Sequence, residues 1–488
     1  MILKRISIYI IFCLHFSINF AQSVEWSNPQ KIKSKTGYSQ IVGESASGIY
    51  LLRCKDNSFS RDVIIEKYKS NLAQELSIPM PININGILER VLLFDNTIYV
   101  FVSAKNNVSN KIDLLLQKLD ENLKPIGNAQ VLISMNSEEI DNKTHFYIKH
   151  SSEKKFIGVM FLSNRKEKNN SNLNLFCFDG NMQQQYGKQY DLPYSIDDIF
   201  ITSYDMGNEG ECYLLIDYPK SGVKKKGSDS RSFFLYSYSL GMDKMLEYEV
   251  GQSDVFIEEI GMCLNNYSKK ISIAGFYSKD NSKKVAGYFY YVLDLASNEL
   301  ITKRFETFPL DFISKRYNTK GTDDLSDLYI RKLVARSDGG CLLLAEKYYL
   351  SRQTYTYYVN GFPQTNSRTV YNYDDVQMMS FNADGSLQFN NTISKSQSSI
   401  SDGGYYSSIV PIITAENLYV VYNNDVSTEG DMMLSYANNK GLIENKILVK
   451  AINTSALIIP SETKQVSSSS ILACSLRDKR FTLMRITF

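Results

Sequence analysis

The chain has 488 residues, 43% of them hydrophobic and 12% aromatic, with 54 basic and 52 acidic side chains. This near-balance provides no basic field to displace the counterions of a nucleic acid, so nucleic-acid binding is excluded as the main function. The chain has only three histidines, which excludes a metal or catalytic site built from several of them.

The N-terminal segment predicts export. Lys4 and Arg5 form a short basic head, an apolar run extends from Ile6 to Phe20, and the small residue Ala21 follows. This order is typical of a secretory signal, and the run is too short to span a membrane comfortably as a helix. We assign residues 1–21 to a signal peptide and expect a secreted protein, in the periplasm, on the outer surface or outside the cell. No later segment predicts a transmembrane helix.

Six cysteines remain in the mature chain, and they are scattered singly through strand-like sequence: Cys54, Cys177, Cys212, Cys263, Cys341 and Cys474. Their spacing resembles neither a disulfide-dense module nor a zinc site. We expect buried free thiols that act as small apolar residues.

One strand-and-turn pattern recurs along the mature chain. It alternates apolar or aromatic residues with polar ones and ends in Asn, Asp or Gly, as in Phe176–Met182. The central apolar residue stands at positions 68, 119, 178, 238, 293, 381, 436 and 486, so the steps run from 50 to 60 residues except for one of 88. This is the length of a propeller blade. No long apolar stripe has the helical period, so little helix is expected.

Further strands complete each unit. A second strand precedes the repeated one in six units: Thr97–Val102, Phe156–Phe161, Cys212–Ile216, Ile271–Phe276, Cys341–Ala345 and Leu418–Tyr422. A first strand and a strand after the turn bring the number to four. The sequence therefore predicts an all-β closed β-propeller of about eight four-stranded blades, with seven as the alternative count.

The two ends of the chain predict how the ring closes. The last unit stops at Phe488 without a fourth strand, whereas Val24–Ile32 precedes the first unit as an orphan. Pairing this segment with Met484–Phe488 would complete the last blade and remove the open sheet edges. We therefore expect residues 22–488 to form a single propeller domain, and a monomer.

With this repeat and this N-terminal segment, the chain resembles exported bacterial β-propeller proteins of uncharacterised function, over essentially all of its mature length. It lacks an aspartate-box run and a paired Gly-His and Trp-Asp signature, and Trp26 is its only tryptophan. The resemblance implies architecture and export, and it carries over no catalytic residues.

One polar residue precedes an apolar step at the start of four units: His145, Asp198, Asp254 and Asp327. Since the first strand of a propeller blade lines the central channel, these side chains would ring one mouth and could bind a cation or a hydroxyl-rich ligand. The alternative is that each one caps a strand at a turn. Acidic pairs at 138–139, 197–198, 258–259 and 323–324 extend this into an acidic rim or a solvated face. No cofactor and no metal site are predicted, and calcium is the one ion that such a rim would suit.

The step of 88 residues contains an insertion, Ser351–Asp375, in which the Asn360–Gly361 turn predicts a projecting hairpin. Its tyrosines are Tyr355, Tyr357, Tyr358, Tyr371 and Tyr373. Exposed tyrosines suit sugar stacking or protein contact. Alternatively, they pack against each other or against a neighbouring blade.

Two functions fit these observations. The first is a non-enzymatic scaffold, secreted or associated with the cell envelope, that binds a protein or glycan partner through the channel mouth and the insertion. The second is a carbohydrate-active enzyme, a glycoside hydrolase or lyase, that uses the rim carboxylates Asp198, Asp254 and Asp327. A purely supporting role in an outer assembly is a third. The chain has no nucleophile elbow, phosphate-binding loop or dinucleotide fingerprint.

Overall fold

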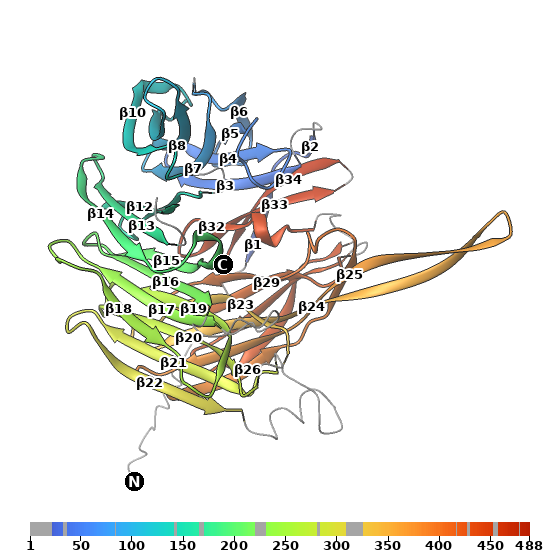
Figure 1. Cartoon of the computed structure of the whole chain (residues 1–488). Coiled ribbons are helices and arrows are strands. Elements are labelled where there is room, and N and C mark those ends of the chain that lie inside the picture. Colours follow the sequence, from blue (N-terminus) through green and yellow to red (C-terminus); the bar gives the residue numbers. More distant parts are fainter. Residues whose placement is uncertain are drawn as a thin grey trace, which may run out of the picture.

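The computed structural model describes residues 22–32, 37–82, 84–140, 144–164, 170–219, 231–280, 284–308, 326–415, 417–426, 430–451, 457–477 and 479–488. In these residues the strands form eight antiparallel sheets, each with its strands in chain order except the last. The predicted β-propeller of eight four-stranded blades is confirmed (Figure 1). The signal peptide assigned to residues 1–21 lies outside the described residues.

We number the sheets as blades 1 to 8. Blade 1 contains β3 (Tyr38–Ser45), β4 (Gly48–Cys54), β5 (Ile64–Tyr68) and β6 (Gln74–Pro79). Blade 2 contains β7 (Ile87–Phe94), β8 (Thr97–Asn106), β9 (Lys111–Leu119) and β10 (Pro125–Asn136). Blade 3 contains β11 (Tyr147–His150), β12 (Phe156–Asn164), β13 (Ser171–Asp179) and β14 (Gln184–Leu192).

Blade 4 follows the short 3-10 helix η1 (Ile196–Asp198) and contains β15 (Phe200–Met206), β16 (Cys212–Pro219), β17 (Arg231–Tyr238) and β18 (Leu246–Val250). Blade 5 contains β19 (Phe256–Asn265), β20 (Lys270–Ser278), β21 (Gly287–Asp294) and β22 (Glu299–Thr307). Blade 6 contains β23 (Leu328–Ala335), β24 (Cys341–Val359), β25 (Phe362–Phe381) and β26 (Leu387–Ile393), and β27 (Gln397–Ile400) pairs with β25.

Blade 7 contains β28 (Val410–Ile413), β29 (Leu418–Asn423), β30 (Met432–Ala437) and β31 (Ile443–Val449). Blade 8 follows the 3-10 helix η3 (Pro460–Glu462) and contains β32 (Lys464–Gln465), β33 (Ser470–Arg477) and β34 (Arg480–Thr487). All eight repeated strands of the sequence analysis are the third strands of their blades, and the six that precede them are second strands.

The N-terminal segment completes blade 8, as predicted. It forms two short strands, β1 (Ser23–Trp26) and β2 (Gln30–Lys31), and both pair antiparallel with β34. Between them, the Ser27 amide donates to the carbonyl of Leu483 over 2.8 Å. The pairing extends further along β34 than Met484–Phe488, because β2 reaches Arg480.

The core consists of eight clusters of buried apolar side chains among the described residues, each shared by two neighbouring blades. The cluster between blades 8 and 1 closes the ring, since Ile41 and Ile49 of blade 1 pack with Leu472 and Phe481 of blade 8. Each blade therefore buries both faces of its sheet, which explains why its middle strands are apolar in nearly continuous runs.

The turn after the third strand shows why Asp and Asn recur there. In blade 3, the Asp179 carboxylate accepts the backbone amides of Asn181 and Gln183, both over 2.9 Å. Met182 adopts a left-handed conformation (φ 66°) that points its side chain into the core between blades 2 and 3. The aspartate side chain thus takes the place of a backbone partner while the chain reverses.

The six cysteines of the sequence analysis are buried and free, which confirms that prediction. Burial raises the pKa of the Cys177 thiol to about 12, so this thiol is inert near neutral pH. In the described part of the chain, no helix is long and apolar enough to cross a membrane.

Candidate functional site

One face of the ring carries the starts of the first strands and the connections from second to third strands. We call it the upper face. It holds the four polar residues that the sequence predicts at the channel mouth, because β11, β15, β19 and β23 all begin there. It also holds the hairpin of blade 6, which extends far beyond the rest of the ring (Figure 1).

The four predicted mouth residues are all exposed, at corresponding ends of four successive first strands: His145, Asp198, Asp254 and Asp327. Asp198 ends η1, and its backbone carbonyl accepts a hydrogen bond from the Arg231 guanidinium over 2.8 Å. Asp327 lines a hollow that reaches from blade 4 to blade 6. Among the described residues, no three His, Cys, Asp or Glu side chains are grouped to hold a metal ion.

A repeated β-bulge places polar side chains beside this mouth. In blades 2, 4, 5 and 6 the first strand has one extra residue, and its side chain is hydrogen-bonded to a polar residue of the second strand. The pairs are Glu89 with Ser103, Thr202 with Asp217, Glu258 with Ser278, and Arg331 with Glu346. In blade 1 the equivalent positions are Val42 and Leu52. The bulge is therefore shared by several blades, whereas the side chains at its two positions differ from blade to blade.

The hollow beside blade 5 has a volume of about 360 Å³ and is lined by Thr202, Asp217, Arg231, Glu258, Glu259 and Asp327, among others. Burial raises the pKa of Glu259 to about 7, with a smaller contribution from the Glu258 charge. The Ile330 amide donates to the Glu259 carboxylate over 3.3 Å and opposes this rise. Glu259 can therefore gain or lose a proton near neutral pH.

This pKa predicts that the protein loses stability as the pH rises. Between about pH 4.5 and pH 7, folded Glu259 holds a proton that the unfolded chain has released, so the free energy of unfolding falls with pH, by about 3 kcal/mol in total at 1.36 kcal/mol per pKa unit. Glu259→Gln should remove this slope in chemical denaturation at pH 5 and pH 8. The exposed Glu299→Gln serves as the control, and equal slopes in wild type and Glu259→Gln would contradict the prediction.

A larger cavity of about 670 Å³ lies on the same face, between blades 1 and 6 and the segments that lead into blades 7 and 8. We call it the Arg331 cavity. Its lining includes Tyr38, Arg331, Tyr373, Asp402, Tyr405, Ser407 and Glu462. The Tyr405 hydroxyl donates to the Glu462 carboxylate over 2.7 Å, and burial raises the pKa of that carboxyl.

A buried ionic network holds Arg331, which lines this cavity. Glu346 has no exposed surface, and its carboxylate lies 2.7 Å from Arg331 Nε and 2.7 Å from Lys395 Nζ. Lys395 also donates to the Gln397 side chain over 2.8 Å and to the Tyr373 carbonyl over 3.0 Å. Burial lowers the pKa of Lys395, and the Glu346 charge opposes that change. The network joins the first and second strands of blade 6 to the segment that follows β26.

The insertion of the sequence analysis forms the outer part of the β24–β25 hairpin, which pairs continuously from Tyr348 with Tyr373 to Val359 with Phe362. The turn is Asn360–Gly361, with φ angles of 51° and 82°. Tyr371 and Tyr373 are half-buried at the base, where β27 pairs with β25. Tyr355, Tyr357 and Tyr358 are exposed on the outer part. These three tyrosines therefore do not pack on a neighbouring blade, which was one of the alternatives to an exposed binding surface. The ring centroids of Tyr355 and Tyr357 lie 6.1 Å apart, so these two side chains are neighbours on the ribbon.

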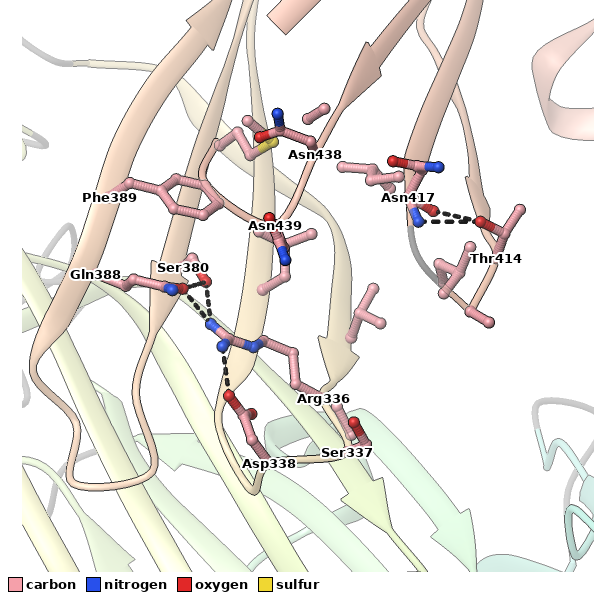
Figure 2. A pocket seen from close by; sticks show the side chains of 18 residues that line it. Arg336, Ser337, Asp338, Ser380, Gln388, Phe389, Thr414, Asn417, Asn438 and Asn439 are labelled. Carbon is pink, nitrogen blue, oxygen red and sulfur yellow. Dashed lines mark hydrogen bonds and ion pairs between the residues drawn. The ribbon is translucent and has the colours of Figure 1, made fainter. Parts of the chain in front are cut away.

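A third cavity, of about 510 Å³, lies on the opposite face between blades 6 and 7 (Figure 2). Its arginine, Arg336, has partners on both terminal nitrogens: Nη1 donates to Ser380 and Gln388, and Nη2 to Asp338. Figure 2 shows these side chains turned toward the guanidinium. By contrast, Arg331 Nη2 has no hydrogen-bond partner among the described residues.

No protein-family model and no curated protein matches the chain. Among solved structures, the polysaccharide lyase Uly1 aligns with 95% of this chain and 99% of its own, at 10% identity and a TM-score of 0.39. The WD40 domain of SCAP from fission yeast aligns over 96% and 95%, at 9% identity and a TM-score of 0.41. The β-propeller domain of the Trilobed protease from Pyrococcus furiosus aligns over 85% and 97%, at 8% identity and a TM-score of 0.36. The activities in these names are those of the other proteins.

The residues of the ionic network were missed from the sequence. One signal was present: the apolar second strand of blade 6 continues directly into Glu346, as that of blade 4 continues into Asp217. A charged residue inside the pleated, buried part of a strand needs a partner, so its position alone predicts a buried polar contact. Lys395 gives no such signal, because it lies between β26 and β27.

Proposed function

We propose that this protein is an exported β-propeller scaffold that binds a protein partner through the outer part of the β24–β25 hairpin and performs no catalysis itself. The exposed hairpin tip supports this most directly. Residues 353–367 include no charged side chain, and Tyr358 and Phe362 are 72% and 70% exposed. Neighbouring exposed aromatic side chains of this kind are typical of the anchors in protein interfaces.

The geometry of the hairpin adds a second argument. A two-stranded ribbon is marginally stable in water unless something packs on it, and residues 351–364 are exposed on both faces. Beyond Thr369, whose carbonyl accepts the Ser401 amide, neither strand has an outer neighbour among the described residues. A protein with an apolar cleft would cover the aromatic tip, and its own strand could add to the open edge. Nucleic acids and anionic lipids need a larger positive field than the two basic side chains of the ribbon between Ser351 and Val370, Arg352 and Arg368, provide.

A site-specific crosslinking experiment in the native host tests this proposal. A photoreactive phenylalanine analogue replaces Tyr358 or Phe362 and, as the matched control, Tyr267, which is 88% exposed in the loop between β19 and β20 on the opposite face. We expect the same protein adduct at Tyr358 and Phe362 and none at Tyr267. The same adducts at all three positions, or adducts with lipid alone, would refute the proposal.

A shortened hairpin provides the matching loss of function. Deletion of residues 352–359 and 362–369 joins Ser351 and Val370, which already pair, across the native Asn360–Gly361 turn. Because the blade below this point is unchanged, we expect the melting temperature to stay within a few degrees. The partner found by crosslinking should no longer copurify with the shortened protein.

Export is part of the proposal. It is supported by the basic head, apolar run and small residue of segment 1–21. A carbohydrate-active enzyme remains the second candidate, because Glu259, with a pKa of about 7, has the protonation behaviour of a general acid. Release of sugar from a polysaccharide panel by the wild type and not by Glu259→Gln would favour it.

A further inference from the structure

We infer that the Arg331 cavity is a binding site for a neutral saccharide. It is separate from the hairpin tip, so the inference does not depend on the partner proposed above. With a volume of about 670 Å³, the cavity lies within the range of about 300–1,000 Å³ that is usual for small-molecule sites. Blades 1 and 6 and the segments that lead into blades 7 and 8 contribute to its wall, so the site depends on residues that are far apart in sequence.

Unsatisfied polar groups in the wall point to a ligand. Ser407 is 3% exposed and lines the cavity, and its hydroxyl has no hydrogen-bond partner among the described residues. Arg331 Nη2, in the same wall, also lacks one. A buried polar group without a partner costs about 1–3 kcal/mol. Both atoms have almost no accessible surface, so a ligand hydroxyl gains a hydrogen bond to either of them only after a small movement of the neighbouring side chains.

The charges around the cavity argue for a neutral ligand. A cation would meet the guanidinium of Arg331 and, behind it, the ammonium of Lys395. An anion would meet the carboxylate of Asp402, which lines the cavity. This carboxylate accepts hydrogen bonds from the Ser399 hydroxyl over 2.6 Å and from the Gly404 amide over 2.9 Å. A hydroxyl-rich ligand can satisfy both kinds of group, since each hydroxyl donates and accepts.

Aromatic rings complete the site. Tyr38 and Tyr405 meet edge to face with their centroids 5.9 Å apart, and both line the cavity with Tyr373. The Tyr373 ring lies so close to Gly404 that a Cβ there would come within 2.5 Å of the tyrosine hydroxyl. Gly404 also has a φ of 73°, so glycine is required here both for the space that the ring takes and for the backbone conformation. Flat rings beside hydroxyl-binding groups match the apolar faces and polar edge of a pyranose ring.

Binding of defined trisaccharides to the mature protein (residues 22–488) tests the inference. The probes are maltotriose, cellotriose, laminaritriose and chitotriose, with trigalacturonate as the charged comparison, measured by saturation-transfer NMR and calorimetry. We expect at least one neutral trisaccharide to bind. Asp402→Asn and Tyr38→Ala should each weaken that binding at least tenfold, whereas Tyr267→Ala on the opposite face should not change it.

Three results would overturn the inference. The first is that no neutral probe binds at about 10 mM, a concentration at which a dissociation constant of about 1 mM would still be detected. The second is that trigalacturonate alone binds. The third is that Asp402→Asn and Tyr38→Ala both leave the affinity unchanged. Equal melting temperatures of the variants and the wild type show that the fold is intact. The shortened hairpin should bind the same sugar with unchanged affinity, so this site and the partner site can fail independently.

Discussion

Removal of residues 22–32 from a protein of residues 22–488 is expected to lower its free energy of unfolding by about 3–6 kcal/mol, because Val24, Trp26 and Ile32 lose their packing against blades 7, 8 and 1. The deletion also exposes the outer edge of β34, with which β1 and β2 pair. An open edge of this kind invites pairing between molecules. We therefore expect a lower melting temperature and concentration-dependent oligomers in size-exclusion chromatography.

Adding the segment back separates this effect from a general loss of folding. A synthetic peptide of residues 22–32 should restore the monomer and most of the melting temperature. Trp26 is the only tryptophan of the chain, so its emission in the added peptide reports docking directly. A truncated protein that melts like the wild type and stays monomeric would show that the ring does not need this strand.

Glu346→Gln is expected to cost about 3–5 kcal/mol of unfolding free energy, the usual effect of removing one partner from a buried ion pair. The substitution keeps the shape of the side chain but removes the charge that Arg331 and Lys395 both contact at 2.7 Å. Lys395 then becomes a buried ammonium without a counter-charge at that distance. Chemical denaturation followed by circular dichroism measures the loss.

A double-mutant cycle tests whether the ion pair itself is responsible. Lys395→Met removes the buried ammonium, so Glu346→Gln with Lys395→Met should be more stable than Glu346→Gln alone. Glu444→Gln, an exposed position in β31, is the control for loss of a carboxylate and should change stability by less than about 0.5 kcal/mol. Additive effects of the two substitutions would mean that Glu346 and Lys395 are not coupled.

The strands and their order were predictable because their causes are local. Alternation of apolar and polar residues identified the third strand of every blade, and in most blades an aspartate, asparagine or glycine at the following turn supported it. The closing strand was predictable for a different reason, since an unpaired segment at each end leaves one arrangement that buries both edges. These features depend on residues that are close in sequence or on a simple count of strands.

The ionic network and the Arg331 cavity could not be predicted from the same patterns. Arg331 and Glu346 lie on neighbouring strands, β23 and β24, but the bulge of β23 decides that they meet, and Lys395 joins them from the distant segment after β26. The raised pKa of Glu259 has the same origin, since burial by neighbouring blades causes it. Sequence identified the acidic pair at 258–259 but gave no reason to separate Glu259 from Glu258.

The recurring bulge of the first strands has a consequence for how such a protein can diverge. A bulged residue lies outside the regular ladder of its strand. Val42 in blade 1 still belongs to an apolar cluster between blades, but the bulged residues of blades 2, 4, 5 and 6 belong to none. Blades 2, 4, 5 and 6 already carry Glu, Thr, Glu and Arg at this point. Each of these four blades can thus exchange the polar group at its bulge by a single substitution, while the strand pairing and the apolar clusters of the ring stay the same.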